Sequence, residues 1–276
     1  MKNKVLRTVY YAALWSVVFI FIAPIIWIGM STFKSKADIL ALPPKFIFSP
    51  TLQNLVDLFS RPTFSKALAN SLLLSFTSVT IALLVSFLAS YAFSRFKPRV
   101  TNFFMFLLLS IRMVPAAASV VPLFLMYSNL GWKGTHFGII LFYAMFSIPF
   151  SVWILKGFLD GVSMRFDETA LVCGGGKLHT MFKIILPQIR PGLVSAFIFN
   201  LIFVWNEFLF GFIIGGAKVE AMPVTLATGA FTSTGIDWPF VASLSFFNLI
   251  PLIIVMFFFQ KYLLVGMTFG TVRGEV

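Results

Sequence analysis

Six long apolar stretches limit what this chain of 276 residues can fold into. Each approaches or exceeds the roughly 20 residues that a helix needs to cross about 30 Å of hydrocarbon. Backbone amides inside lipid have no water to bond, so each stretch is predicted to be a helix. Prolines inside three of the spans predict kinks. The predicted spans are residues 9–30, 67–93, 101–127, 137–155, 192–214 and 240–262, and the prolines are Pro115, Pro122, Pro149 and Pro251.

The composition supports an integral membrane protein. The chain is 59% hydrophobic and only 11% charged, which is too little charge to cover the surface of a soluble domain. Its net charge of +12 would suit a nucleic-acid partner. The basic residues are scattered between apolar spans and form no patch, however, so we expect no nucleic-acid binding.

The first apolar stretch is either a membrane span or a cleaved signal peptide. Lys2, Lys4 and Arg7 precede it, as basic residues precede the apolar core of a signal peptide. The uncharged run 9–30 is long enough to span, and no small-residue cleavage site closes it. We therefore expect it to remain in the protein.

Lysine and arginine are distributed unevenly between the two sides of the predicted membrane domain. On one side, three lie at the N-terminus, three in 94–100, five in 156–190 and two from Lys261 onward, thirteen in total. The other side has seven, and Arg112 lies within a span. Because cytoplasmic loops carry the excess, both termini and segment 160–191 are predicted to be cytoplasmic.

Segment 160–191 is predicted to be an amphipathic helix-turn-helix that projects from the membrane body. Three glycines at 174–176 separate two runs of apolar residues at helical spacing. Ser163 is a candidate N-cap, and Pro187 is expected to end the second run. Such an element can dock a soluble partner. The apolar residues are Val162, Phe166, Ala170 and Cys173, then Leu178, Met181, Phe182 and Ile185.

This segment resembles the EAA loop of ABC-importer permeases. Glu168, Ala170, Gly174 and Leu186-Pro187 lie at the spacing of that loop. Thr169, Cys173 and Gly175 depart from it, since Ala, Asp and Ala are usual there. The resemblance implies that an ATPase subunit contacts the loop. The coupling residues expected on this basis are Glu168, Thr169, Ala170, Cys173, Gly174, Leu178 and Met181.

Further motifs resemble carbohydrate permeases of the maltose-transporter type, from about residue 70 to the C-terminus. The resemblance implies the type I ABC importer permease fold, an all-α membrane protein of six transmembrane helices. A cytoplasmic coupling helix would lie between the fourth and fifth, within a single domain over 1–276. The motifs are Arg112–Pro115 with Pro122-Leu123, Leu130–Trp132 with Thr135, Trp205–Phe208, Met222–Val224, Gln260–Tyr262 and the tail Gly266–Gly274.

The same resemblance implies one permease subunit of a binding-protein-dependent ABC importer, forming half of a pathway for a carbohydrate or, alternatively, for a non-sugar solute. Its expected partners in a prokaryotic inner membrane are a second homologous permease, two ATPase subunits, an extracytoplasmic substrate-binding protein, membrane lipid and the sugar. ATP and Mg would bind the ATPases, because Gly174–Lys177 lacks the phosphate-loop pattern: Leu171 and Leu178 replace the required Gly and Ser/Thr. We expect no cofactor, catalytic residue or metal site in this chain.

Two neighbouring residues of the fifth span suit a sugar path. The indole of Trp205 can stack on a pyranose ring, and the amide of Asn206 can both donate and accept hydrogen bonds. They are equally consistent with an interfacial aromatic residue and a helix-packing amide. Ser245 and Asn248, one helical turn apart in the sixth span, are further candidates.

Arg112 and Glu207 are charged residues within predicted spans. At 1.5 Å per residue they lie about 18 Å and about 21 Å from the cytoplasmic ends of their spans. A lone charge there costs roughly 3 kcal/mol or more, so we predict that the two pair at an outer gate. Alternatively, each faces a wet cavity. A secondary transporter would need several buried acids, and a polytopic enzyme a catalytic cluster, which the sequence lacks.

Overall fold

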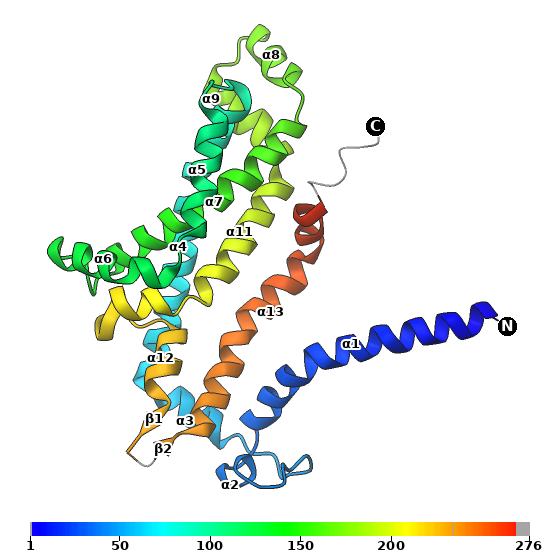
Figure 1. Ribbon diagram of the computed structural model, residues 1–276, viewed down its shortest axis with the longest axis vertical. Coiled ribbons are helices and arrows are strands. Elements are labelled where there is room, and N and C mark those ends of the chain that lie inside the picture. The colour runs from blue at the N-terminus through cyan, green and yellow to red at the C-terminus, as the bar shows by residue number, and fades with distance from the viewer. Residues whose placement is uncertain (1, 234, 269–276) are drawn as a thin grey trace. The chain divides into compact units, whose positions relative to one another are not determined.

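The computed structural model describes residues 2–233 and 235–268, which form two compact units built from distant parts of the chain (Figure 1). The first unit contains the described residues up to Lys66 together with Thr225–Pro251. The second contains Ala67–Val224 and the described residues from Leu252 onward. Two long helices, α4 (Pro62–Arg95) and α13 (Trp238–Thr268), belong partly to each unit.

The remaining elements are helical except for one small hairpin. The first unit has α1 (Lys2–Thr32), α2 (Lys36–Ile39), α3 (Gln53–Ser60) and the antiparallel strands β1 (Phe231–Thr232) and β2 (Gly235–Ile236). The second unit has α5 (Thr101–Met113), α6 (Ala116–Asn129), α7 (His136–Gly161), α8 (Arg165–Val172), α9 (Lys177–His179), the π-helix η1 (Thr180–Ile185), α10 (Leu186–Gln188), α11 (Arg190–Trp205), the π-helix η2 (Gly211–Gly215) and the 3₁₀-helix η3 (Gly216–Lys218). Helix α12 (Met222–Gly229) continues from the second unit into the first.

Four of the six predicted spans are single helices. In the described part of the chain, four helices are long and apolar enough to cross a membrane, or up to six spans if each of two bent helix pairs counts as one. The predictions of helices over 9–30, 67–93, 137–155 and 240–262 are therefore confirmed. The four helices are Leu6–Thr32, Pro62–Arg95, His136–Gly161 and Trp238–Tyr262.

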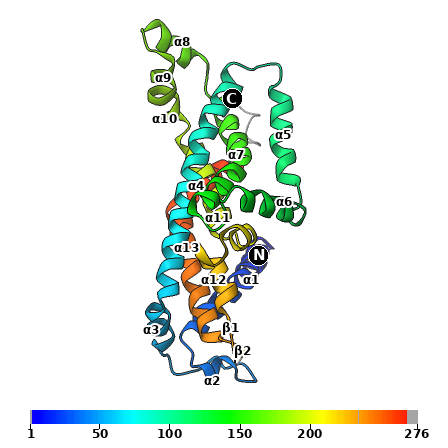
Figure 2. The same ribbon diagram turned by 90° about the vertical axis from the view of Figure 1, so that its left-hand side faces the viewer.

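The prediction of one helix over 101–127 is wrong. Helices α5 and α6 meet at 93°, and Figure 2 shows the sharp bend between them. Pro115 has no amide hydrogen, and its ring disfavours a helical conformation at the preceding Val114, which is extended with φ −63° and ψ 124°. The third span is thus broken in two, whereas Pro122, Pro149 and Pro251 remain inside helices.

The prediction of one helix over 192–214 is also wrong. Helix α11 covers only Arg190–Trp205 and follows a bend of 76° from the segment Lys177–Gln188. The bend lies at buried Ile189. Pro191 then begins α11, where a missing amide hydrogen removes no helical hydrogen bond.

Small polar residues form one buried face of α4. They recur every three or four positions, so they share one side of the helix, and Ala67 and Ala82 continue the same series. Ser86 and Ser90 donate hydrogen bonds to backbone carbonyls of α7 at 3.3 and 3.2 Å. Short side chains let two backbones approach this closely. The buried serines are Ser71, Ser75, Ser78, Ser86, Ser90 and Ser94.

Helix α7 also packs against α11. The Nδ2 atom of the fully buried Asn200 donates to Ser151 Oγ at 2.9 Å and to Ala196 O at 2.7 Å. At Gly192, an added Cβ would lie 2.5 Å from the ring of Phe158, so only glycine allows this approach. Helices α4, α7 and α11 therefore form the core of the second unit.

Buried polar contacts also hold the first unit together. Asn54 Nδ2 donates to the carbonyls of Thr32 and Lys34 at 2.9 and 2.7 Å. Arg61 pairs with Asp237 at 2.7 Å. At the exposed segment after α1, hydrogen bonds from Lys45 and Ser35 hold the pKa of Asp38 below its usual value. These contacts join α1, α3 and α13 within one unit.

Candidate functional site

The polar segment that the sequence predicts as a docking element begins with α8, at one end of the second unit (Figure 1). Helix α8 starts two residues later than the serine proposed to cap it. Met164 occupies the N-cap position, so the prediction for Ser163 is wrong. Its hydroxyl instead accepts a hydrogen bond from Arg165 N at 3.3 Å.

The glycine turn ends α8 with a Schellman motif. Gly174 N donates to Leu171 O at 3.0 Å, and Gly175 N donates to Ala170 O at 2.8 Å. Gly174 has φ +83°, in the left-handed region that side chains disfavour, and nothing lies within 4 Å of a Cβ added there. At Gly175 such a Cβ would lie 2.8 Å from Ala170 O. Gly174 thus supplies the turn, and Gly175 the close approach.

The second helical run does not end at Pro187 as predicted. It continues to Gln188, and the break lies at Ile189. In a regular helix Pro187 could not donate to the carbonyl of Lys183, and its ring would collide with that carbonyl. The turn that contains Lys183 is instead part of the wider π-helix over Thr180–Ile185, so the helix is wider where the proline ring would collide.

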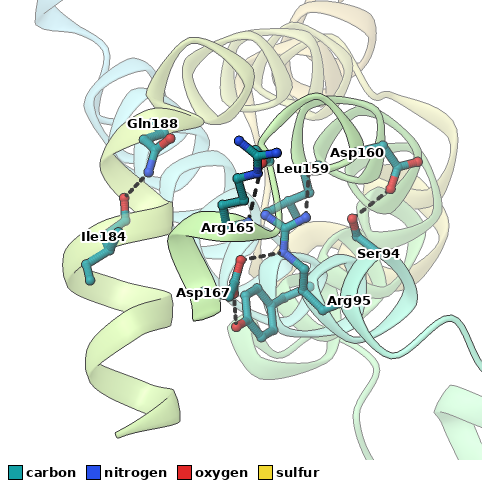
Figure 3. A network of polar contacts seen from close by, with 10 residues as sticks. Ser94, Arg95, Leu159, Asp160, Arg165, Asp167, Ile184 and Gln188 are labelled. Carbon is teal, nitrogen blue, oxygen red and sulfur yellow. Dashed lines mark hydrogen bonds and ion pairs between the residues drawn. The ribbon is translucent and has the colours of Figure 1, made fainter. Parts of the chain in front are cut away.

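Asp167 anchors α8 to the membrane helices (Figure 3). Its Oδ2 lies 3.0 Å from Arg95 Nε at the end of α4, and both side chains are largely buried, with 6% of Arg95 and 13% of Asp167 exposed. Its Oδ1 accepts a hydrogen bond from the hydroxyl of Tyr91 at 2.6 Å. Arg95 Nη1 also donates to Leu159 O of α7 at 3.2 Å. One ion pair therefore connects three helices.

A second acidic residue, Asp160, joins the same ends of α4 and α7 (Figure 3). Ser94 Oγ donates to Asp160 Oδ1 at 2.6 Å, and Lys156 Nζ lies 2.7 Å from Oδ2. The carboxylates of Asp167 and Asp160 thus fix the base of the docking segment to the ends of α4 and α7.

The outer face of the segment is apolar and exposed. Val172 is 89% exposed, Leu178 69% and Leu171 50%. Apolar side chains that cluster on a water-exposed surface usually mark a site where a partner binds. Glu168, Thr169, Cys173 and Gly174 are exposed beside them. This face is the part of the segment that a partner can touch.

Two of the residues predicted to contact a partner point inward instead. Ala170 is 6% and Met181 5% exposed, and Met181 packs into a core cluster with Phe87 of α4 and Leu155 of α7. Direct contact of these two residues with a partner stays a prediction. Their positions fix the segment against the membrane helices.

The sequence reasoning missed several residues of the site. Arg95 and Tyr91 lie more than seventy positions before Asp167, and no local pattern links them. Leu171 and Val172 did carry a signal, because these apolar residues lie outside the predicted helical series that contains Ala170 and Cys173. These two add to the exposed face.

Glu207 stabilises the break after α11. Its carboxylate accepts hydrogen bonds from Phe210 N and Gly211 N, both at 2.9 Å, and from the hydroxyl of Tyr143 at 2.8 Å. Gly211 is required here, since an added Cβ would lie 2.8 Å from that hydroxyl. The acid thus caps the next helical segment, where amide hydrogens lack helical partners.

Arg112 does not pair with Glu207, so that prediction is wrong in this structure. Its guanidinium carbon lies 4.6 Å from the ring centre of Phe146, 5.0 Å from that of Phe203 and 5.4 Å from that of Phe150. Aromatic faces attract a cation at these distances. Arg112 is thus surrounded by aromatic rings, whereas Glu207 is satisfied by backbone amides.

The other path candidates lie in different surroundings. Trp205 is buried, with 2% of its surface exposed, whereas Asn206 is exposed and donates to Ile202 O at 2.8 Å. Ser245 and Asn248 are half-buried on α13 in the first unit. Among the described residues, no three His, Cys, Asp or Glu side chains gather as a metal site would require. The tail motif from Phe269 to Gly274 lies outside the described residues.

The sequence matches a known family over most of its length. Residues 79–268 match the family described as binding-protein-dependent transport system inner membrane component. The chain is 30% identical to the trehalose/maltose transport system permease protein MalG of Thermococcus litoralis, over 100% of both chains. It is 27% identical to the diacetylchitobiose uptake system permease protein NgcG of Streptomyces coelicolor, over 94% of this chain and 86% of that protein.

A solved structure has the same fold. One chain of a bacterial ABC transporter involved in the import of the acidic polysaccharide alginate superposes with a TM-score of 0.79 at 20% identity, over 95% of this chain and 98% of that one. The fold predicted from the resemblance is therefore confirmed at the level of architecture.

We expect Gly174 to tolerate asparagine better than valine. Asparagine enters the left-handed region readily, whereas a β-branched residue loses roughly 1–2 kcal/mol there. Hydrogen–deuterium exchange of the backbone amides of residues 174 and 175 should accelerate about tenfold in Gly174→Val. In Gly174→Asn it should change little. Equal protection in both variants would contradict the role of the left-handed turn.

Loss of the Asp167 charge should release α8 from the membrane helices. Removing one partner of a buried ion pair costs about 3–5 kcal/mol, so Asp167→Asn should strongly increase amide exchange in α8. Glu168→Gln makes the same change in charge at the adjacent, exposed position and should leave exchange at the wild-type rate. An unaltered α8 in Asp167→Asn would show that the pair with Arg95 does not hold it.

Proposed function

The chain belongs to the family of binding-protein-dependent transport system inner membrane components, and we propose that it forms half of the translocation pathway of an ATP-driven importer for a carbohydrate. It is a membrane permease subunit and not an enzyme. The relatives named for trehalose/maltose and diacetylchitobiose uptake support the carbohydrate class. In this proposal the two units work as a single permease domain over 1–276.

The observation that carries the proposal is the exposed apolar face of α8 and α9. A segment that only linked two spans would not need Val172 and Leu178 in water. Nor would it need a largely buried ion pair between Asp167 and Arg95 to fix its orientation. Both features suit a surface that receives force from a soluble ATPase subunit.

The excess of lysine and arginine on one side supports a cytoplasmic position for this segment and for both termini in a prokaryotic inner membrane. Two ATPase subunits would then dock from that side and hold ATP and Mg. A second, homologous permease would complete the pathway, and an extracytoplasmic binding protein would deliver the sugar.

The pathway through this subunit would include residues near the breaks in the third and fifth spans. Arg112 lies in the last turn of α5, directly before the break at Pro115, and Asn206 and Glu207 lie where α11 ends. Unwound backbone offers polar groups to a sugar, and the proposal adds Trp205 to this route. Ser245 and Asn248 are the path candidates of the first unit.

Exposed Val172 should be required for assembly with the ATPase. Burying a charge in an apolar interface typically costs about 2 kcal/mol or more, which is roughly a 30-fold loss of affinity. Val172→Asp should therefore lose the ATPase subunit during co-purification from membranes. Ile47→Asp changes a comparably exposed residue, 95% against 89%, on the segment between α2 and α3 and should retain it. Retention in both variants would contradict the coupling surface.

Uptake in a strain that lacks this chain tests the cargo. We expect the strain to lose accumulation of at least one labelled oligosaccharide, glycoside or polyol and to regain it with the wild-type chain. Normal sugar uptake together with loss of amino-acid or phosphate uptake would overturn the carbohydrate class and leave the coupling surface unaffected.

A further inference from the structure

A cavity of about 640 Å³ lies at the same end of the second unit as the docking segment. It opens between the end of α4, the start of α5 and the end of α7. Arg95, Lys97, Arg99 and Lys156 line it, with Asp160 as the one lining carboxylate. Four cations against one anion leave a net charge of +3.

Part of this positive charge has no counter-charge within the described chain. Lys156 is paired with Asp160 at 2.7 Å, and Arg95 with Asp167 at 3.0 Å. Lys97 and Arg99 are exposed, and neither joins any of the ion pairs within 4.0 Å among residues 2–233 and 235–268. The lining therefore favours an anion.

Arg95 is the buried member of the lining. Its side chain is 94% buried, and its Nη2 atom has no hydrogen-bond partner. Because Asp167 lies 3.0 Å from its Nε, Arg95 adds little net charge, and the positive potential comes mainly from Lys97 and Arg99.

The backbone around the cavity also contributes positive potential. Helix α5 begins at Thr101, which lines the cavity with Asn102, and the residue before it, Val100, provides no side-chain cap. The start of a helix is the positive end of its dipole. Lys97 has φ +41°, a left-handed conformation that a side chain disfavours. The fold thus keeps a strained lysine at the edge of an anion-attracting cavity.

Exposed aromatic residues adjoin this basic lining. Phe96 lies between Arg95 and Lys97 and is 62% exposed, and Phe103 and Phe106 on the next helix are 62% and 69% exposed. Since α4 ends and α5 begins here, the cavity lies at the level of the lipid headgroups if the two helices enter the membrane. A charged cavity beside an apolar surface matches an amphiphile with an anionic head.

We propose that this cavity binds the phosphate group of an anionic phospholipid from the surrounding bilayer, mainly through Lys97 and Arg99. Basic clusters at the ends of membrane helices recognise such headgroups, and arginine binds phosphate oxygens in a planar, two-pronged geometry. A free phosphate would use the cations but not the exposed phenylalanines. A phospholipid uses both, because its phosphate meets the cations and its acyl chains meet the phenylalanines.

The test compares two charge-matched double variants of the transporter, each purified with its partner subunits from vesicles of phosphatidylcholine and phosphatidylglycerol. Native mass spectrometry measures the phosphatidylglycerol that stays bound. Lys97→Gln/Arg99→Gln should weaken retention roughly 30-fold, since each cation near an anionic headgroup contributes about fivefold. Lys4→Gln/Arg7→Gln removes the same charge from exposed positions of α1 and should retain lipid as the wild type does.

A third variant separates loss of charge from loss of fold. Lys97→Arg/Arg99→Lys keeps both charges and should retain phosphatidylglycerol. Wild-type retention in Lys97→Gln/Arg99→Gln would overturn the proposal, as would displacement of the lipid by inorganic phosphate. Loss of a protein subunit from this variant, with lipid retention unchanged, would assign the cavity to a protein contact instead.

Discussion

The structure of the second unit depends on the close contact between α4 and α7. Ser86 and Ser90 bring the α4 side chains within hydrogen-bonding distance of the α7 backbone. The other contacts of this unit depend on the position of these two helices. Helix α11 packs against α7 through Asn200. The docking segment is tied to the ends of α4 and α7 through Asp167 and Asp160. A larger residue on the serine face would separate the helices on which all of these contacts rely.

Breaks in the helices create polar groups that lipid cannot satisfy, and the chain satisfies several of them locally. Glu207 accepts two amide hydrogens after α11 ends. Outside the predicted spans, the amides of Gly174 and Gly175 close the end of α8 in a similar way. Since an unsatisfied backbone group in hydrocarbon costs several kcal/mol, an acid inside a predicted span need not imply a proton path or an ion pair. Here the carboxylate replaces missing helical partners.

The sequence predicted the helical class, four continuous spans and the helices on both sides of the glycine turn, because these follow from the length and spacing of apolar residues. It did not predict the 93° break at Pro115, since proline in a membrane helix is compatible with a mild kink as well as a full break. The Asp167–Arg95 pair could not be predicted from the sequence for another reason. It joins residues 72 positions apart, and only the packing of α4 against α7 brings them together. Met181 fits the helical period on either face, so its burial depends on where Phe87 lies.

The docking segment has two mechanically different connections to the membrane helices. At its start, α8 is held by side chains, through an ion pair and a hydrogen bond at Asp167. At its end, α10 continues through one buried residue, Ile189, into α11 at 76°. Side-chain contacts can break without moving the backbone of the helix that they touch, whereas displacement of a buried bend must move the helix that follows it. A partner that tilts the segment would therefore loosen α8 first and transmit its motion through α11. That helix ends at Trp205, directly before the break that Glu207 caps, so the motion would reach the unwound backbone in the middle of the membrane domain.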